Sequence, residues 1–431
     1  MSAGAALLAL AAGCGALAQP IDYARIRALN LEPNMGPGEG NAGARAPDEP
    51  RPAGAVLETR PPLNPVAKPA FREQTRAVAV KTKTAIAATV VAHGFQRAWK
   101  IVFRPDGRMF VTEKSGRIRI VTPDGKIGEP LGGVPEVLNY SDAGFFDLAL
   151  DPDFARTRRI FFSYVEYRKD GNGLTVATAT LSPDETMMQD VRIIFSAPAH
   201  NNVGHYGGRI LVQPDRTLLV TVGDHFLPQL RIKAQDLDST LGKIVRINFD
   251  GSIPADNPFA QVRAAEGAIW ALGVRNIEGL VRDSRGAVWA SDIGPQTGDE
   301  IDRIEPGHNY GWPVVGYGTE YSGKLINNGR SSWPGTDQPV YYWDPTIAPS
   351  GITFYSGKLI PEWSGNLFVG ALAGQHLARL VMRNGHVVGE ERLLQDRRQR
   401  IRDVVEGPDG ALWVLTDSND GQLLRLAPIG R

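Results

Sequence analysis

A histidine and an aspartate stand where two neighbouring strands would bring their side chains together. His205 lies in the segment NNVGHYGGR, and a turn at residues 215–216 would pair the strands on either side of it. In that pairing Gly207 lies opposite Asp224, and His205 lies diagonal to the carboxylate with no side chain between them. An imidazole oriented by a carboxylate has a fixed tautomer and can act as a general base. A histidine that only satisfies a loop carbonyl would fit the same spacing.

An arginine beside an amide forms a second candidate group. Arg275 and Asn276 occur in the segment IWALGVRNIEGLVRD, framed by Gly273 and Gly279. A guanidinium in this position could reach an anionic or carbonyl oxygen of a ligand. A structural arginine that bonds loop carbonyls is the alternative interpretation.

A loop after the next strand offers ligands for a hard cation. Gly294 and Pro295 are followed closely by Gly298, Asp299 and Glu300. Backbone carbonyls flanked by carboxylates are the oxygen ligands that calcium prefers. An ordinary acid-rich turn would have the same composition, so the segment by itself leaves the metal open.

Two arginines near the end of the chain could hold carboxylates. Arg400 and Arg402 alternate along a short strand and therefore share one face. Solvated charge next to Arg397 and Arg398 is the alternative. Upstream, the aromatic and proline-rich loop at residues 343–350 could either cover a flat ligand or pack at the rim of the fold.

A repeated unit must position these groups. From residue 90 onward the chain repeats an apolar strand, a turn of the Pro-Asp-Gly type and a second strand, as in IVFRPDGRMFVTE and VVEGPDGALWVLTD. Six such units of about 57 residues each have room for four strands and their loops. The pattern predicts an all-β, six-bladed propeller of four-stranded antiparallel blades. Seven or eight blades, or a pair of β-sandwiches, account less well for six turns of one type.

Composition excludes some partners. The 431 residues contain 47 basic and 47 acidic side chains, so no excess of positive charge exists to neutralise the phosphates of a nucleic acid. The single cysteine, Cys14, excludes a disulfide within the mature fold. The 48 glycines and 31 prolines suit a fold of many short strands joined by tight turns.

The chain begins with a segment typical of export. Residues 1–18 form a short apolar run that ends in a possible A-x-A cleavage site, Ala16-Leu17-Ala18. A lipoprotein signal with Cys14 as the lipidated residue is the alternative, so a lipid anchor is the one membrane attachment considered. Residues 19–88 lack hydrophobic periodicity and are predicted to be a linker or disordered arm. Residues 89–431 form the predicted propeller, in a periplasmic or secreted protein.

From about residue 90 to 428 the chain resembles the soluble quinoprotein glucose dehydrogenases and, more closely, the bacterial aldose sugar dehydrogenases. The segments that carry the resemblance include LALDPDF, HYGGRI, AQDLDSTLGKIVRINFDGSIPADNPF, IGPQTGDEIDRIEPGHNYGWPVVGYG and RIRDVVEGPDGALWVLTD. Such a resemblance implies an oxidoreductase that uses pyrroloquinoline quinone and calcium. It implies oxidation of the anomeric hydroxyl of an aldose to the lactone, with hydride transfer to the quinone and a quinone or cytochrome as electron acceptor.

The resemblance also implies roles for the residues that could perform chemistry. His205 matches the family's general base, and Asp224 matches the carboxylate that orients it. Arg275 matches the arginine near the quinone oxygen where negative charge develops, with Asn276 beside it. Hydride acceptance by the quinone and proton removal by His205 would then act together.

For the remaining candidates the implied roles concern the cofactor and the metal. The backbones of Gly294 and Pro295 match the family's calcium ligands. Arg400 and Arg402 match residues that hold the carboxylates of the cofactor. Asp142 stands where the family has a glutamine that contacts cofactor and substrate.

Two departures from the family add negative charge near a cofactor that carries three carboxylates. Asp142 replaces that glutamine, and Glu278 replaces a second glutamine in the segment RNIEG. Because like charges repel, calcium, Lys100 or another cation would have to compensate. Two other functions stay open: a calcium-dependent hydrolase of the lactonase type, and a non-catalytic carbohydrate-binding propeller.

Overall fold

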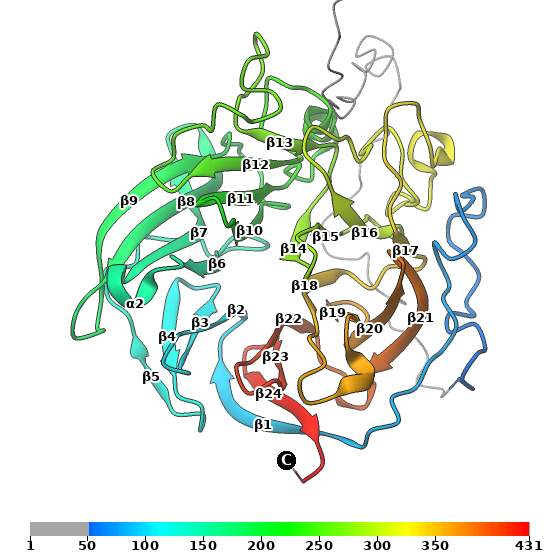
Figure 1. Cartoon of the computed structure of the whole chain (residues 1–431). Coiled ribbons are helices and arrows are strands. Elements are labelled where there is room, and N and C mark those ends of the chain that lie inside the picture. Colours follow the sequence, from blue (N-terminus) through cyan, green and yellow to red (C-terminus); the bar gives the residue numbers. More distant parts are fainter. Residues whose placement is uncertain (1–50, 431) are drawn as a thin grey trace, which may run out of the picture.

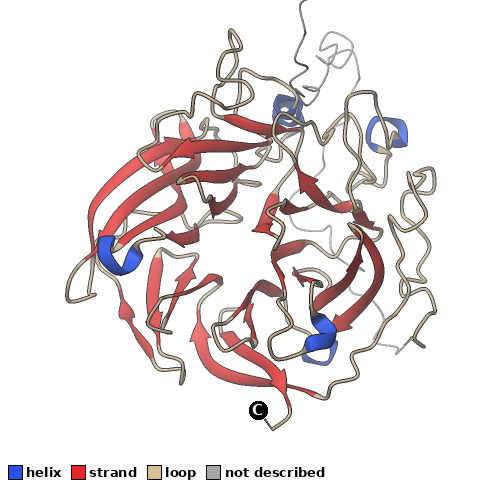
Figure 2. Cartoon of the chain, viewed as in Figure 1, coloured by secondary structure: helices blue, strands red, loops and turns tan. Residues whose placement is uncertain are grey.

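The chain folds into six four-stranded antiparallel sheets, which radiate from a common centre (Figure 1). This computed structural model describes residues 51–430. Strands make up most of the regular structure, and the few helices are short turns between them (Figure 2). The predicted six-bladed propeller is thereby confirmed. None of the helices within residues 51–430 has the length and apolar character needed to cross a bilayer.

The first strand of each sheet is innermost, since these strands contact one another from blade to blade. The first three blades comprise β2 (Ala98–Phe103), β3 (Met109–Glu113), β4 (Arg117–Val121) and β5 (Ile127–Pro130); β6 (Phe145–Leu150), β7 (Arg159–Arg168), β8 (Gly171–Leu181) and β9 (Met188–Ser196); and β10 (Gly207–Val212), β11 (Thr217–Val222), β12 (Lys243–Asn248) and β13 (Ile269–Leu272).

The other three blades have the same order. They comprise β14 (Ile277–Arg282), β15 (Val288–Asp292), β16 (Asp299–Ile304) and β17 (Tyr341–Trp343); β18 (Pro349–Phe354), β19 (Leu367–Ala371), β20 (His376–Arg383) and β21 (His386–Leu393); and β22 (Ile401–Glu406), β23 (Leu412–Thr416), β24 (Gly421–Pro428) and β1 (Ile86–Phe95). The short helices are α2 (Phe154–Thr157) and α3 (Pro228–Arg231), with 3-10 turns at Ile232–Ala234, Ile326–Gly329, Pro361–Trp363 and Gln395–Arg397.

The sixth blade is completed by a strand from the other end of the chain. β1 pairs antiparallel with β24, from Ile86 opposite Pro428 to Phe95 opposite Gly421. This pairing joins the first and last parts of the propeller and leaves no gap in the ring of blades. Strands such as β11 and β19 consist mostly of apolar residues because blades pack against both of their faces and bury every residue.

Every inner strand has an irregular register near its first residue. The shifts fall between Ala98 and Lys100, Phe145 and Leu148, Gly207 and Ile210, Ile277 and Gly279, Pro349 and Ile352, and Ile401 and Asp403. A β-bulge bends a strand and redirects its side chains, and bulges are common beside active sites. Most of the candidate residues lie near these bulges, just before or at the start of the inner strands β6, β10, β14 and β22. The others, Asp224, Gly294 and Pro295, follow the second strands β11 and β15.

Residues 51–85 do not form the disordered arm expected from their composition. They follow the outer side of the fourth and fifth blades (Figure 1), where Thr75 forms a bridge with Tyr342 and Ala79 forms one with Glu390. Backbone hydrogen bonds and buried polar side chains fix this segment, which is why the absence of hydrophobic periodicity did not reveal it. Residues 1–50, with the predicted signal peptide and Cys14, lie outside the described residues.

One carboxylate ties this N-terminal segment to the propeller. Asp344 accepts hydrogen bonds from the backbone N–H groups of Leu63 (2.9 Å) and Asn64 (3.1 Å). The Asn64 amide in turn donates to the carbonyls of Tyr317 (3.1 Å) and Gly318 (3.3 Å). The N-terminal segment therefore braces two loops, one of which carries Tyr317 to the wall of the candidate site.

Replacing Asp344 with alanine is expected to destabilise the fold by about 2 kcal/mol, because the buried N–H of Asn64 and the partly buried N–H of Leu63 lose a charged acceptor. Equilibrium denaturation of the full chain measures the change. Asp420→Ala is the matched control, since Asp420 is a largely exposed carboxylate whose partner, His93, is also exposed. Equal stability of the two variants would show that the N-terminal segment is not anchored at Asp344.

Candidate active site

His205 and Asp224 meet in a hydrogen bond of 2.8 Å between Nδ1 and Oδ1. His205 precedes β10 and Asp224 follows β11, the two strands expected to carry them. The predicted register is wrong, because Gly207 pairs with Val222 instead of Asp224. The regular part of the hairpin, with Ile210 opposite Val220, is already shifted by one residue, and the bulge between Gly207 and Ile210 adds a second. The side chains still meet since both stand at the same end of this hairpin.

Asp224 is held from several sides. Its Oδ2 accepts a hydrogen bond from the indole N–H of Trp312 (2.8 Å), and its Oδ1 accepts one from the backbone of Phe226 (2.8 Å). Burial alone would raise the pKa of Asp224, but the charge of His205, their hydrogen bond and Arg275 together lower it. An ionised Asp224 fixes a proton on Nδ1 of His205 and leaves Nε2 as the basic nitrogen.

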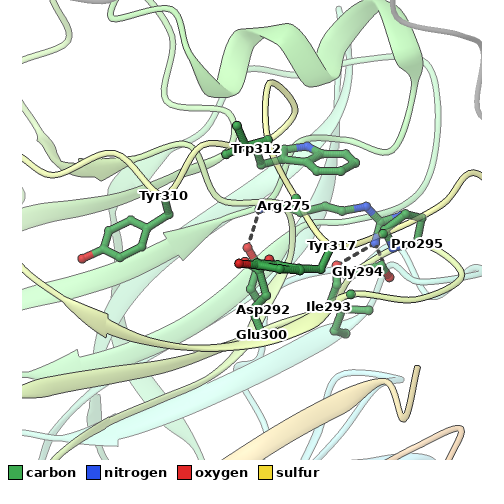
Figure 3. Close-up of a pocket in the computed structure, with 13 residues that line it drawn as sticks. Arg275, Asp292, Ile293, Gly294, Pro295, Glu300, Tyr310, Trp312 and Tyr317 are labelled. Atoms are coloured by element: carbon green, nitrogen blue, oxygen red, sulfur yellow. Dashed lines mark hydrogen bonds between the residues drawn. The ribbon is translucent and has the colours of Figure 1, made fainter. Parts of the chain in front are cut away.

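Arg275 points a partly unpartnered guanidinium at a pocket (Figure 3). Its Nη1 donates to the carbonyls of Ile293 (2.7 Å) and Gly294 (2.9 Å). Its Nε and Nη2 are buried and have no hydrogen-bond partner within residues 51–430. Its guanidinium carbon lies 5.3 Å from the centre of the Trp312 ring. Buried donors of this kind are suited to an anionic or carbonyl oxygen of a ligand.

A buried carboxylate fixes the backbone that carries Arg275. Asp292 accepts from the backbone N–H groups of Arg275 (2.7 Å) and Asn276 (2.6 Å), and burial raises its pKa to about 6. The amide of Asn276 is occupied by protein groups, since its oxygen accepts from the Gly207 N–H (3.0 Å) and its nitrogen donates to Glu278 (3.3 Å). Asn276 thus connects the third and fourth blades.

The loop predicted to bind calcium lines the same pocket. Gly294 and Pro295 both contribute to its wall (Figure 3). The carboxylate of Asp299 is occupied, because it accepts from the N–H groups of Gly294 (2.8 Å), Ile347 (2.6 Å) and Ala348 (2.8 Å). Asp299 therefore holds the loop in place and is not a free ligand.

Two other carboxyl groups near this loop, those of Glu300 and Asp302, form no ion pair in the part of the chain that the structure describes. The pKa values of Glu300 and Asp302 lie well above their usual range, mainly because of burial and secondly because nearby carboxylates repel their negative charge. Both oxygens of Asp302 are buried and make no hydrogen bond within the described chain. Among residues 51–430, no three His, Cys, Asp or Glu side chains converge into a metal site, so a cation here would also need backbone or ligand oxygens.

The structure brings Arg400 and Arg402 together on one carboxylate, Asp417. Its Oδ2 lies 3.2 Å from Arg400 Nε and 3.0 Å from Arg402 Nη2, while its Oδ1 lies 2.9 Å from Arg97 Nε. Burial would raise the pKa of Asp417, but these three cations hold it well below its usual range. Arg402 also forms an ion pair with Glu278. Neither arginine is the simply solvated charge of the alternative interpretation.

Asp142 is exposed beside Gly204, the neighbour of His205. Its charge interacts with Lys114, whose pKa is lowered to about 8 by burial and by Arg402, with Asp142 acting in the opposite direction. Lys100, one of the cations suggested to compensate this charge, pairs with a different carboxylate, since its Nζ lies 3.4 Å from Asp403. Lys114 therefore provides the cation near Asp142.

These contacts form one continuous network around the propeller axis. His205 and Asp224 connect through the backbone to Arg275, and Asn276 connects onward through Glu278 to the arginines of the sixth blade. Sequence reasoning did not identify Trp312, Lys114 or Asp292. Trp312 lies in the segment HNYGWPVVGYG, a part of the family resemblance that could have pointed to it, whereas no spacing pattern marks Lys114.

Comparison with known proteins gives consistent matches over the propeller. A family model described as Glucose / Sorbosone dehydrogenase matches residues 95–425. An aldose sugar dehydrogenase of Escherichia coli (strain K12) is 39% identical over 335 residues, which cover 77% of this chain and 90% of that protein. Quinoprotein glucose dehydrogenase B of Acinetobacter calcoaceticus is 27% identical over 409 residues, which cover 76% of this chain and 85% of that protein.

A solved structure agrees. The crystal structure of the soluble aldose sugar dehydrogenase from Escherichia coli, in the apo form, has a TM-score of 0.76 at 37% identity and covers 80% of this chain and 100% of that one. The matched segment, residues 95–425, spans well over half of the chain and contains every candidate site residue. The chain therefore belongs to the Glucose / Sorbosone dehydrogenase family, a family of oxidoreductases.

Proposed function

We propose that the protein is an aldose dehydrogenase dependent on pyrroloquinoline quinone, which oxidises the anomeric hydroxyl of its substrate to the lactone. The observation that carries the proposal is the His205–Asp224 pair connected to Arg275, whose buried Nε and Nη2 have no hydrogen-bond partner among the described residues. Relatives named aldose sugar dehydrogenase and quinoprotein glucose dehydrogenase support it.

In this proposal His205 is the general base. Its Nε2 takes the proton of the anomeric hydroxyl, and Asp224 stabilises the imidazolium that results, since it remains ionised beside Nδ1. Trp312 holds the other carboxylate oxygen and so limits rotation of Asp224. The quinone, when bound, supplies the acceptor for the hydride that leaves the anomeric carbon.

The residues of the chain fit a quinone that carries carboxylates. Arg275 would donate to the oxygen that becomes negatively charged through Nε and Nη2, the two donors that form no hydrogen bond within residues 51–430. Arg400, which is partly exposed, and Arg402 would hold carboxylates, with Asn276 supporting the start of β14. Asp142 would lie at the edge of the site, with its charge offset by Lys114.

Calcium is proposed as the second cofactor. The carbonyls of Gly294 and Pro295 would contribute ligands at the pocket wall. The Gly294 carbonyl now accepts from Arg275, so an ion there would share this oxygen with the guanidinium. Glu300 and Asp302 have no cationic partner within residues 51–430, and a divalent cation in this part of the molecule would favour their ionised forms.

The first 18 residues suggest where the protein is located, and the family suggests its substrate and electron acceptor. We propose a periplasmic or secreted enzyme, with Cys14 as a lipid anchor if the lipoprotein signal is used. An aldose would be the substrate, and a quinone or a small cytochrome would take the electrons.

Reconstitution of the purified protein with pyrroloquinoline quinone and calcium tests the proposal. Dye reduction with a panel of aldoses is expected only when both cofactors are present, because the base and Arg275 need an electron acceptor between them. Turnover of lactones without the quinone would favour the hydrolase instead. Sugar binding without turnover with any electron acceptor would favour a binding protein.

A further inference from the structure

Glu278 places a carboxylate among the arginines of the candidate cofactor site. It belongs to β14, and its side chain is 18% exposed. Its Oε2 forms an ion pair with Nη1 of Arg402, and its Oε1 accepts from the amide of Asn276 (3.3 Å).

Arg402 is therefore already paired on both terminal nitrogens. Nη2 lies 3.0 Å from Asp417, which also binds Arg400 and Arg97, and only the buried Nε lacks a partner within the described residues. An incoming carboxylate meets a guanidinium whose charge is balanced by Glu278 on one side and by Asp417 on the other. To bind Arg402 directly, it must displace one of them or share the cation with it.

Glu278 is the partner that can be displaced at lower cost. Asp417 is almost completely buried and interacts with three arginines, so moving it would leave three cations without their common acceptor. Glu278 interacts with one arginine and one amide and is more exposed, so water can solvate it when it leaves Arg402.

We propose that Glu278 is an internal counter-anion that competes with the carboxylates of the cofactor for Arg402, and so keeps the quinone exchangeable. The inference rests on the proposed function. It assigns to Glu278 a role in setting the affinity and the dissociation rate of the cofactor, with no part in the chemical step.

Glu278→Gln tests this role, because it removes the charge while retaining an oxygen that can accept from Asn276. Equilibrium dialysis with pyrroloquinoline quinone and calcium is expected to give a Kd at least about tenfold lower than for the wild-type protein. Gel filtration of the loaded proteins is expected to show slower loss of quinone from Glu278→Gln. Glu185→Gln is the matched control, since Glu185, in the turn between β8 and β9, also pairs with arginines, Arg104 and Arg108, in the turn between β2 and β3.

Each result decides the question. Tighter binding by Glu278→Gln, with no change for Glu185→Gln, supports competition for Arg402. If the wild-type protein binds the quinone and Glu278→Gln binds it with the same or a higher Kd, this inference alone is overturned. Glu278 would then only position Arg402. Absence of quinone binding by both proteins would overturn the inference together with the proposed function. Denaturation curves of both apo-proteins establish that each variant is folded.

Discussion

Replacing His205 with asparagine is expected to lower kcat for aldose oxidation by about 10²- to 10⁴-fold, the range that a general base contributes. The loss follows because Asp224 holds Nδ1 at 2.8 Å and leaves Nε2 as the base. Asparagine is a better choice than alanine, since His205 has a φ of 46° and asparagine tolerates that left-handed conformation. Steady-state dye reduction by the loaded enzyme measures the effect.

Quinone affinity should change little in His205→Asn, which separates a loss of chemistry from a loss of cofactor. His93→Asn is the matched control, because His93 is exposed on β1, where it pairs with Asp420. Asp224→Asn should also lower kcat, since an amide donating to Nδ1 favours the tautomer that carries its proton on Nε2. Retention of wild-type kcat by His205→Asn would exclude it as the base.

Replacing Arg275 with methionine is expected to lower kcat/KM by about 10²- to 10³-fold, the loss seen when a donor to a developing negative charge is removed. Two buried donors, Nε and Nη2, would be lost from the site. The Kd for the quinone, measured by equilibrium dialysis, should rise as well. This second measurement is needed because Nη1 also holds the carbonyls of Ile293 and Gly294.

Arg104→Met provides the control for loss of a buried arginine. Arg104 lies over the ring of Phe110 and pairs with Glu185, away from the residues of the candidate site. Both variants should lose stability, but only Arg275→Met should lose quinone affinity and turnover. If both variants differ from the wild-type protein in stability alone, Arg275 has a structural role and the proposed contact with the quinone fails.

The six-bladed fold could be predicted from the sequence because its strands and turns repeat. Turn residues such as those of RPDG and GPDG act over four positions, and apolar strands buried on both faces are recognisable one at a time. Six repetitions of the same local signal therefore predicted the six blades. Local information also brought His205 to Asp224, because both stand at one end of a single hairpin.

The exact pairing of the inner strands and the position of the N-terminal segment depend on contacts between residues far apart in the sequence. The register shift places Val222 opposite Gly207 without separating His205 from Asp224. The N-terminal segment is bound through polar anchors such as Asn64, which leave no hydrophobic pattern to detect.

The electrostatic partners in the site were decided only by the tertiary structure. Trp312 lies 88 positions from Asp224, and Glu278 lies 124 positions from Arg402. No spacing rule connects such residues, because they come from different blades that meet at the axis. The sequence determined which groups could perform chemistry. The assembly of the blades into a ring determined which charged side chains form ion pairs with one another. For this reason the sequence predicts that the carboxylate of Glu278 repels the cofactor, since that follows from its charge alone. Its pairing with Arg402 depends on two blades meeting and could be seen only in the structure.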